Sequence, residues 1–418
     1  MALDPFFFDS KDPSFVANPY PIYKILREEA PVYYSERYKT WFISTYNHAK
    51  MVFGKEEYFG FQNNTKGQMD LNPSWESTVK NARGFEGYLA MKNKVIESQG
   101  LWIASREGVD HHRIRKEFNP SFSPTRLKIS EPLIRNRITQ IIRNHKGKSG
   151  MSIVSNLSAP LTTKIFLDLL GLSQDRSAWI QSHSLSLSKL FFLDISSKEK
   201  EQGLSTLIDF MEFFRKELRD NPHGDSSTLI ACLLEGKCMG RTSMDEILAN
   251  LSFFILAGIQ ASVYLISNMF YCLQQNPEQL RVLKANPSLI ERAVEETLRC
   301  ETPNSFTERY VLKGLEIGGH NMEKGQKVII LTGAANRDER VFDNSEKFDI
   351  LRNPNPHLAF GFGTRYCIGS YLARLEAKLV LEEMLKNFPD FSIDADQTLD
   401  WYYNFRLRGL NELKIRLY

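Results

Sequence analysis

The sequence lacks the features that mark secreted, membrane-bound and multi-domain proteins. The first residues, Met1 to Pro5, contain no basic segment followed by an apolar run, so we expect no signal peptide and no membrane anchor. No stretch approaches the roughly 18 to 20 apolar residues that a membrane-spanning helix needs. No repeat, low-complexity tract or linker rich in Ser, Gly and Pro divides the 418 residues. We therefore expect a single cytoplasmic domain, residues 1–418, without membrane contact.

Paired cysteines and a large excess of charge are missing too. The cysteines are scattered, without the spacing of a disulfide framework, which suits a reducing compartment. Cys232 and Cys238 have no second pair of ligands nearby, so we expect no zinc site. The net charge of +3 is too small to indicate nucleic acid as a partner, although it permits a basic patch for an acidic redox partner.

The chain does have the composition of a globular protein, with 42% hydrophobic and 25% charged residues, and mostly helical patterns. The longest predicted helix runs from Met244 to Gln275, with Ser243 and Glu246 as a capping box and Pro277 as its stop. Apolar residues surround this helix on most faces, which predicts a path through the interior. We expect a mainly α fold with small β-sheets, whose strands lie at Val32–Tyr34, Trp41–Ser44, Leu315–Ile317 and Lys327–Leu331.

One cysteine stands in a distinctive loop. Residues 360–369 read Phe-Gly-Phe-Gly-Thr-Arg-Tyr-Cys-Ile-Gly, and apolar residues at three- and four-residue steps after Gly369 predict a helix there. Cys367 would therefore precede a helix N-terminus, where free N–H groups and the helix dipole favour a thiolate. Gly361, Gly363 and Gly369 permit positive φ angles and a close approach to a flat ligand. A thiolate in such a loop can bind haem iron axially and push electron density toward bound oxygen.

This loop resembles the haem-ligand signature of the cytochrome P450 family, Phe-x-x-Gly-x-(His/Arg)-x-Cys-x-Gly, and fits it at every fixed position. The resemblance implies the P450 fold, in which haem lies between a long central helix and the cysteine loop. It also implies haem b as the cofactor, with Cys367 as the axial iron ligand. Further segments resemble the family in the expected order, at His111 to Arg115, Glu296 to Arg299, Ala334 to Asp338 and Phe348 to Arg352.

The same resemblance assigns roles to charged residues. Haem carries two propionates, and carboxylates withdrawn from water need cationic partners. His357, a few residues before the loop, is expected to make a structural hydrogen bond instead of a haem contact. The residues that fall on the family's positions for propionate pairing are His111, Arg115, Arg309 and Arg365.

Two other groups of charged residues are expected to stay away from the substrate. Glu296 and Arg299 share one helix face because they lie at i and i+3. The resemblance implies that they pair with Arg352 in a buried ion network, which locks the loop behind the haem. His112 and Arg113 are expected to be solvated or to face a redox partner.

The predicted central helix departs from the family pattern Ala-Gly-x-(Asp/Glu)-Thr. The chain has Gln260 in place of the acid and Ala261 in place of the alcohol, so the usual proton-delivery pair is missing, whereas Gly258 still leaves space for oxygen. Three interpretations remain open. Ordered water or Ser262 delivers the protons, a substrate hydroxyl or amide completes the relay, or the reaction is a coupling or dehydrogenation that needs fewer protons.

Substrate contacts are expected from segments without fixed motifs. Phe59 to Ile103 carries Met and aromatic side chains among polar residues, and Ser184 to Phe192 occupies the region of a lid helix in the resembled fold. This content indicates an apolar, roomy pocket that suits a medium-sized apolar metabolite.

The resemblance implies a soluble, monomeric haem-thiolate monooxygenase or oxidase that receives electrons through ferredoxin or flavodoxin and its reductase. Hydroxylation in bacterial polyketide or peptide biosynthesis is the expected reaction, on a substrate that is free or bound to a carrier protein. Oxidation or coupling of a cyclic dipeptide is the alternative, because Gly333 to Asp338 resembles a cyclodileucine-oxidising branch. A non-catalytic haem-binding protein is the alternative of another class, because Gln260 and Ala261 remove the proton-delivery pair.

Overall fold

The computed structural model describes residues 12–61, 93, 95–188, 196–220, 228–394, 396–402 and 406–418. The chain groups into two compact units, each assembled from separate stretches. Unit 1 comprises Met1–Phe59, Leu127–Thr162 and Ala261–Tyr418, and unit 2 comprises Gly60–Arg126 and Thr163–Gln260. The single domain expected from the sequence stays a prediction.

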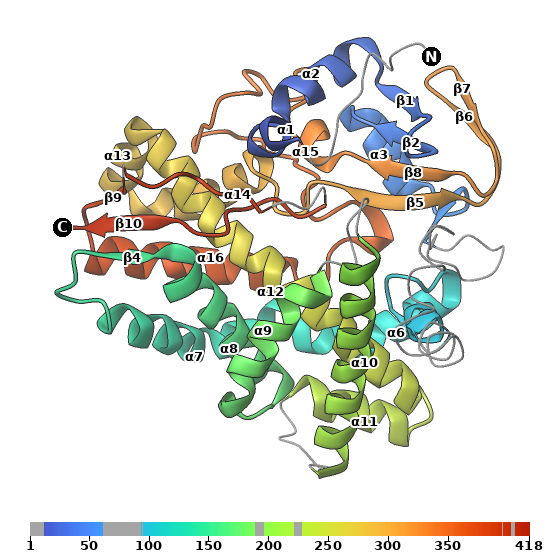
Figure 1. The fold of residues 1–418 in the computed structure, drawn as a ribbon, viewed down its shortest axis with the longest axis horizontal. Coiled ribbons are helices and arrows are strands. Elements are labelled where there is room, and N and C mark those ends of the chain that lie inside the picture. Colours follow the sequence, from blue (N-terminus) through green and yellow to red (C-terminus); the bar gives the residue numbers. More distant parts are fainter. Residues whose placement is uncertain are drawn as a thin grey trace. The chain divides into compact units, whose positions relative to one another are not determined.

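Unit 1 contains the sheets (Figure 1). The largest sheet has the strand order β1-β2-β8-β5-β3, with β2 and β8 parallel and the pairs β1–β2 and β5–β8 antiparallel. The predicted strands are confirmed within one residue at their ends. Their bounds are β1 (Val32–Ser35), β2 (Thr40–Ile43), β3 (Phe59–Gly60), β5 (Thr307–Val311) and β8 (Lys327–Ile330). A hairpin pairs β6 (Leu315–Ile317) with β7 (His320–Met322), and β10 (Lys414–Leu417) lies between β4 (Gly150–Ser152) and β9 (Phe391–Ile393).

The helices of unit 1 come from both ends of the chain. They are α1 (Pro13–Ala17), α2 (Tyr20–Glu29), α3 (Tyr46–Gly54), α13 (Pro277–Ala285), α14 (Ile290–Cys300), α15 (Thr332–Ala335) and α16 (Ser370–Asn387). A unit boundary falls inside α7 (Pro124–Arg143) and another inside α8 (Ala159–Leu170). Short helical turns lie at Ile153–Ser158, Pro287–Leu289 and Gly363–Arg365 in unit 1, and at Asn119–Phe122 and Gln174–Arg176 in unit 2.

Unit 2 is helical in the part that the structure describes. Besides parts of α8 and of α12 (Met244–Gln275), its helices are α6 (Gly108–Phe118), α9 (Ser177–Ser188), α10 (Ser197–Asp220) and α11 (Leu229–Cys238). Helix α9 packs along α10, where Trp179 stacks on Phe213 with ring centroids 4.7 Å apart. Helix α11 approaches α6 so closely at Gly236 that a Cβ there would lie 2.5 Å from the Glu117 carboxylate. A glycine is therefore required at this contact.

The longest helix, α12 (Met244–Gln275), has the predicted bounds. The capping box is also confirmed: the Ser243 N–H donates to Glu246 Oε2 at 3.0 Å, and the Glu246 N–H donates to Ser243 Oγ at 3.1 Å. The expectation that no stretch is apolar enough to cross a membrane was wrong for this helix, which contains an 18-residue window of mean hydropathy 1.7. Inside the protein, 78% of that window is buried, as the predicted interior path requires.

A buried carboxylate joins the two ends of the chain within unit 1. Glu301 accepts hydrogen bonds from the Tyr20 hydroxyl at 2.8 Å and from Arg408 Nε at 2.7 Å, and Arg337 lies 3.6 Å away. The Arg337 guanidinium covers the Tyr20 ring at 3.4 Å, and Arg408 also donates to the Val16 carbonyl at 2.7 Å. These bonds hold the N-terminal helices against the C-terminal segment.

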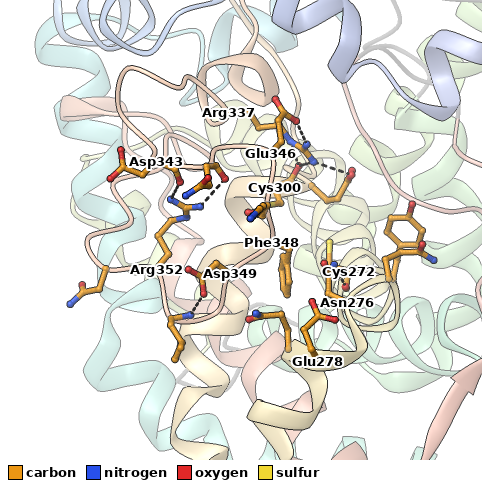
Figure 2. Close-up of a pocket in the computed structure, with 18 of the residues that line it drawn as sticks. Cys272, Asn276, Glu278, Cys300, Arg337, Asp343, Glu346, Phe348, Asp349 and Arg352 are labelled. Atoms are coloured by element: carbon orange, nitrogen blue, oxygen red, sulfur yellow. Dashed lines mark hydrogen bonds and ion pairs between the residues drawn. The ribbon is translucent and has the colours of Figure 1, made fainter.

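A polar cavity of about 1130 Å³ opens beside this network (Figure 2). Side chains of α12 and α14 line it together with the segment that follows α15, including Arg337, Glu346 and Arg352. None of the residues predicted to bind haem lines it. This cavity is therefore distinct from the predicted haem site.

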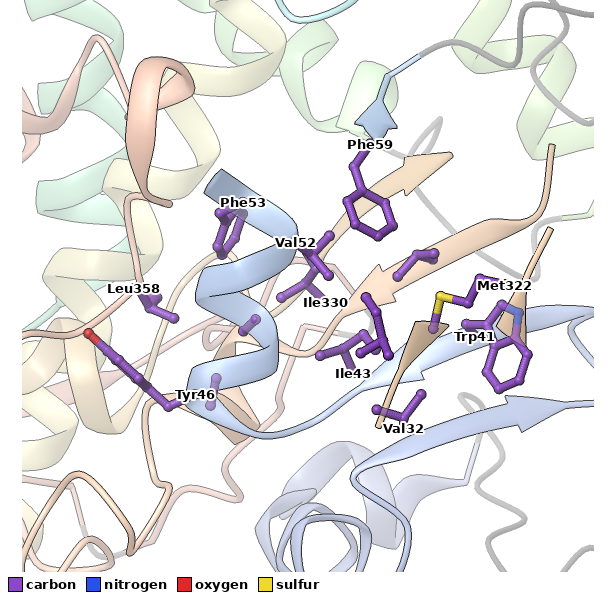
Figure 3. Close-up of a cluster of buried hydrophobic side chains, with 14 of the residues drawn as sticks. Val32, Trp41, Ile43, Tyr46, Val52, Phe53, Phe59, Met322, Ile330 and Leu358 are labelled. Carbon is purple, nitrogen blue, oxygen red and sulfur yellow. The ribbon is translucent and has the colours of Figure 1, made fainter. Parts of the chain in front are cut away.

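One hydrophobic cluster fixes the sheet of unit 1 (Figure 3). Val32, Ile43 and Ile330 come from three neighbouring strands, and Val52 and Phe53 of α3 cover them. Ile43 and Ile330 are fully buried and directly paired in register. The cluster holds α3 against the sheet.

We expect Ile330→Ala to lower the free energy of unfolding by about 2–5 kcal/mol, because it removes a fully buried side chain from the central strand and leaves a cavity. Urea unfolding followed by circular dichroism measures this loss. Leu351→Ala is the control, since Leu351 is 52% exposed, and its effect should stay within about 0.5 kcal/mol. Equal effects of the two substitutions would contradict the assignment of Ile330 to the core.

Candidate active site

The cysteine loop is a compact turn that leads into α16. Gly361 and Gly363 have φ values of 74° and 79°, in the left-handed region that favours glycine, and the Cys367 N–H donates to the Phe360 carbonyl at 2.9 Å. Gly369, for which a positive φ was also considered, has a φ of −84°. Helix α16 begins at Ser370, so Cys367 lies just before a helix N-terminus, as the sequence predicts.

Cys367 differs from the other cysteines in its surroundings. It is exposed, whereas Cys272 and Cys300 are buried. Burial raises the pKa of Cys272 and raises that of Cys300 to about 12, so both stay protonated thiols. Cys238 is exposed too, but it is the last residue of α11 and does not precede a helix N-terminus. The position of Cys367 is thus the one best suited to a metal-binding thiolate.

Two side chains from earlier in the chain hold the loop in place. The amide of buried Asn336 accepts from the Leu358 N–H at 2.7 Å and donates to Thr302 Oγ1 at 2.8 Å. Glu295 of α14 accepts two hydrogen bonds from Arg374, at 2.6 and 2.9 Å, and lies 3.1 Å from His357 Nε2. The structural hydrogen bond expected of His357 is therefore present.

Glu295 and Arg374 were not singled out from the sequence. Burial raises the pKa of Glu295, but hydrogen bonds from Arg374 and His357 outweigh it and bring the pKa down to about 2. Glu291 pairs with Lys378 one turn away, so two charge pairs connect α14 with α16. The matching four-residue spacings of these charges were a signal in the sequence, but only the packed helices show that they face each other.

The predicted ion network of Glu296, Arg299 and Arg352 is present in unit 1. Glu296 and Arg299 are fully buried and joined by two hydrogen bonds, Nε–Oε2 at 2.9 Å and Nη2–Oε1 at 2.8 Å. Arg352 Nε donates to Glu296 Oε1 at 3.2 Å, and Arg299 also donates to the carbonyls of Asn336 and Ser345, at 3.0 and 2.7 Å. The network fixes the segment that precedes the cysteine loop.

Arg309 and Arg365 lie together in unit 1, in a cluster with surplus positive charge. Burial and the neighbouring Arg365 and Arg406 lower the pKa of Arg309, while Glu308 and Glu56 act in the opposite direction. With Lys327, which lies 2.7 Å from Glu308, four cations therefore share two carboxylates. A guanidinium remains charged in proteins, so the crowding favours binding of a further anion at this place. Arg406 was not predicted, and no sequence motif marks it.

His111 and Arg115 lie one turn apart on α6, in unit 2, with His111 buried. The sequence did not predict the partner of their neighbour Arg113, whose side chain is 35% exposed. Its guanidinium donates to Glu246 at 2.6 and 3.3 Å and to the Arg241 carbonyl at 2.7 Å, so it fixes α6 to the start of α12. A bidentate pair of this kind holds its geometry. His112 is exposed, as expected.

The segment of α12 that differs from the family pattern has one accessible side. Ala257 is exposed, and Gly258, Gln260 and Ala261 are half-buried, in a helix that is otherwise mostly buried. The helix remains α-helical throughout this segment. Packing requires a glycine at position 258, because a Cβ there would lie 2.0 Å from the Phe166 ring. Ser262 is turned away from the accessible side and is 6% exposed.

These residues fit a haem group. An exposed cysteine precedes a helix N-terminus, a cluster with surplus positive charge suits two propionates, and small residues line an accessible side of an interior helix. Within the described residues no group of three or more His, Cys, Asp or Glu side chains forms a separate metal site. Most of the Met and aromatic side chains in the two segments expected to supply substrate contacts, Phe59 to Ile103 and Ser184 to Phe192, lie outside the described residues.

Comparisons with known proteins agree with this site. The sequence model of the family described as Cytochrome P450 matches residues 150–407. The chain therefore belongs to the cytochrome P450 family, whose members are monooxygenases that hold haem b through a cysteine thiolate. It is 30% identical over 405 residues to the "Biotin biosynthesis cytochrome P450" of Bacillus subtilis, covering 96% of both chains.

Another relative and a solved structure also match this chain over nearly its whole length. The "6-deoxyerythronolide B hydroxylase" of Saccharopolyspora erythraea is 30% identical over 419 residues, with 98% of both chains covered. The structure of P450BioI in complex with hexadec-9Z-enoic acid ligated acyl carrier protein has a TM-score of 0.87 at 27% identity, covering 97% of this chain and 100% of that one. These matches confirm the predicted P450 fold.

We expect Glu296→Ala to destabilise the protein by roughly 3–5 kcal/mol, because buried Arg299 and Arg352 lose their shared carboxylate. Haem content per chain and the urea midpoint measure the effect, and the predicted product is haem-free or misfolded protein. Glu291→Ala is the matched control on the same helix, since Glu291 is 71% exposed. A stable, haem-loaded variant with altered substrate selectivity would contradict the structural role.

Glu295→Gln should remove part of the acid sensitivity of the fold. The folded-state pKa of about 2 lies below the ordinary value of 4.5, so the carboxylate stabilises the protein above pH 4.5 and loses this effect as pH falls toward 2. Between pH 6 and pH 4 the wild type should lose about 1 kcal/mol more than the variant. Urea midpoints at both pH values test this, with exposed Glu323→Gln as control. Parallel losses in all three proteins would refute it.

Proposed function

We propose that this monooxygenase hydroxylates a medium-to-large apolar small molecule in the biosynthesis of a polyketide or peptide natural product, and that its proton delivery differs from the usual family pattern. The observation that carries the proposal is the pairing of an intact cysteine loop with an accessible helix side whose alcohol is replaced by Ala261. The cysteine loop retains the means to bind haem and activate oxygen. The replacement of the alcohol by Ala261 changes how protons reach the oxygen.

Relatives support the substrate class. Those named above act in biotin biosynthesis and in hydroxylation of 6-deoxyerythronolide B, and a further relative is named for polyketide biosynthesis in Bacillus subtilis. A structural neighbour holds a fatty acid on an acyl carrier protein. We propose a substrate of this apolar, acyl-derived kind, delivered free or on a carrier protein.

In the proposed site Cys367 supplies the axial thiolate, and Arg309, Arg365, His111 and Arg115 pair with the haem propionates. Haem with such a ligand supplies oxygen activation when it is bound. Ala261 leaves room beside the helix, because its side chain does not extend beyond a methyl group, whereas the Phe166 ring fills the space next to Gly258. Gln260 has an amide that donates and accepts hydrogen bonds but does not titrate, so it orients a substrate or water and releases no proton.

We also propose that the protein is a cytoplasmic monomer and receives electrons from ferredoxin or flavodoxin through a reductase, as is typical of bacterial relatives. The cations at Arg309 and Arg365 are buried, so they suit the haem propionates and do not indicate which surface a redox partner contacts. The partner's identity is therefore tested by reconstitution with each carrier in turn.

The structure weakens the cyclic-dipeptide alternative. The resemblance rests on Gly333 to Asp338, and this stretch is buried, with Asn336 bonded to the cysteine loop and to Thr302. Because this segment has a structural role, its sequence gives little information about which substrate the enzyme binds. The non-catalytic alternative loses its support because the loop and the family's cofactor site are retained.

An optical titration of the purified ferric protein tests the proposed function. The panel contains hydroxylated polyketides, their deoxy analogues and cyclic dipeptides. We expect a polyketide to shift the iron from low to high spin, and turnover to collapse for the deoxy analogue alone if a substrate hydroxyl completes proton delivery. Equal turnover of both compounds would show that the protein supplies the protons.

A Cys367→Ser variant is the control for the optical signal, with exposed Cys238→Ser as its match. Loss of the haem-thiolate spectrum in the first and its retention in the second are expected. A spin shift caused only by cyclic dipeptides would overturn the proposed substrate class and favour the alternative reaction.

A further inference from the structure

Ser98 and Trp102 bring two polar groups into the interior of unit 2. Ser98 is 2% exposed and Trp102 is 5% exposed, and neither Ser98 Oγ nor Trp102 Nε1 has a hydrogen-bond partner in the part of the chain that the structure describes. Residues 95–101 are helical and Trp102 follows them directly, so the two side chains lie about one turn apart on the same face. An unpaired buried donor costs free energy, so each of these groups needs an explanation.

Asn250 of α12 holds the backbone on both sides of Trp102. Its Oδ1 accepts from the Ile103 N–H at 2.6 Å, and its Nδ2 donates to the Leu101 carbonyl at 2.9 Å. Asn250 is fully buried, so water does not compete for these hydrogen bonds. The backbone at Trp102 is therefore fixed against α12, and its side chain is the part that is left to turn.

The Trp102 ring lies at the accessible side of α12. It packs on Phe253, with ring centroids 5.0 Å apart. Phe253 is half-buried and lies one helical turn before exposed Ala257 and two turns before half-buried Gln260, so these three residues form one stripe of the helix. All of them belong to unit 2. Residues 95–103, the described end of a segment expected to contact substrate, thus lie beside the helix face that differs from the family pattern.

The chemistry of the two groups suits an uncharged oxygen. An indole N–H only donates, and a serine hydroxyl both donates and accepts. A carbonyl oxygen has two lone pairs and no proton, so both groups can donate to it. A carboxylate would need a cation to offset its burial. Arg106, the cation that follows Trp102 in the chain, already pairs with Glu246 and Asp110.

We propose that Trp102 and Ser98 form a subsite for a carbonyl oxygen of the substrate, that of a ketone, ester or lactone, and that Asn250 positions this subsite. The inference rests on the proposed monooxygenase function and names a chemical group that its substrate carries. Trp102 and Ser98 touch the substrate, whereas Asn250 acts through Trp102 and is a positioning residue. The Trp102 N–H is covered in the structure. Because Asn250 holds the backbone, a turn of the side chain uncovers it.

A subsite of this kind acts mainly by rejecting the wrong substrate. A hydrocarbon of the same shape leaves a buried N–H and a buried hydroxyl unpaired, whereas a carbonyl pairs with both. The bound oxygen also fixes which end of an otherwise apolar molecule faces the accessible side of α12. The subsite therefore determines both which molecule binds and which of its carbons is presented for oxidation.

The first test compares two probes of matched shape, cyclododecanone and cyclododecane, by optical titration of the ferric protein. We expect the wild type to bind the ketone about tenfold more tightly. Trp102→Phe keeps a ring against Phe253 but removes the N–H, so it should weaken ketone binding about tenfold and change hydrocarbon binding less than about twofold. Ser98→Ala should act in the same direction. Trp41→Phe is the matched control, since the Trp41 N–H already donates to Gln326 at 2.8 Å.

The second test observes the N–H itself by nuclear magnetic resonance and needs no turnover. Protein with isotope-labelled tryptophan, in its diamagnetic ferrous carbonyl form, gives an indole N–H signal that Trp102→Phe assigns. Cyclododecanone should shift this signal, cyclododecane should leave it in place, and the Trp41 signal should respond to neither. Asn250→Leu should abolish the shift and the preference for the ketone while hydrocarbon affinity is retained, which a purely structural asparagine would not do.

The outcomes separate this inference from the proposed function. Equal loss of ketone and hydrocarbon affinity in Trp102→Phe, or a Trp102 signal that the ketone does not move, overturns the subsite. Loss of haem from Trp102→Phe overturns it too, because the indole would then be a cofactor contact. If this variant does not fold, Ser98→Ala and the wild-type signal decide.

Turnover of the polyketide panel completes the separation. Panel members that turn over equally well in the wild type, Trp102→Phe and Ser98→Ala overturn the subsite and leave the proposed function intact. A ketone-dependent shift of the Trp102 signal in a protein that turns over no panel member supports the subsite and overturns the proposed function.

Discussion

The placement of the cysteine loop depends on two adjacent carboxylates of α14. Glu295 and Glu296 point to different sides of one helix, because neighbouring residues are about 100° apart. Glu296 holds Arg299 and Arg352, ahead of the loop, and Glu295 holds Arg374 of α16, behind it. The loop is thus fastened at both ends to the same helical turn. Buried ion pairs of this kind contribute little net stability over apolar residues, but they tolerate no loss of a partner, which makes them a device for fixing geometry.

Buried charge in this protein therefore does two different things. On α14, Glu295 and Glu296 are each matched by arginine at hydrogen-bonding distance, and the pKa of Glu295 falls accordingly. Glu376, only two residues from Arg374 on the same helix, has no such partner, and its pKa rises. The contrast arises from the direction each side chain takes from α16. Arg374 turns toward α14 and its acids, whereas Glu376 turns toward α12, which offers a serine and no cation.

Much of the fold was predictable from local pattern. The bounds of α12 follow from a capping box, a long apolar stretch and a proline, and each of these signals is contained within a few residues. The signals that predicted the strands near Val32, Trp41 and Lys327 were equally local. Arg113 shows where such prediction fails. It stands beside a family motif and looks like a surface cation, but its partner Glu246 is 133 residues away, and no local pattern connects them.

The sequence by itself determined the family, the identity of the cysteine loop and the loss of the acid and alcohol at Gln260 and Ala261, because these are properties of residue type and order. Tertiary structure alone decided which charges meet. It brought Glu295 to Arg374, gathered Arg406 beside Arg309, and set Glu376 next to Ser262. The physical reason is that a pKa or an ion pair depends on burial and distance, and both are fixed only when segments far apart in the chain pack together.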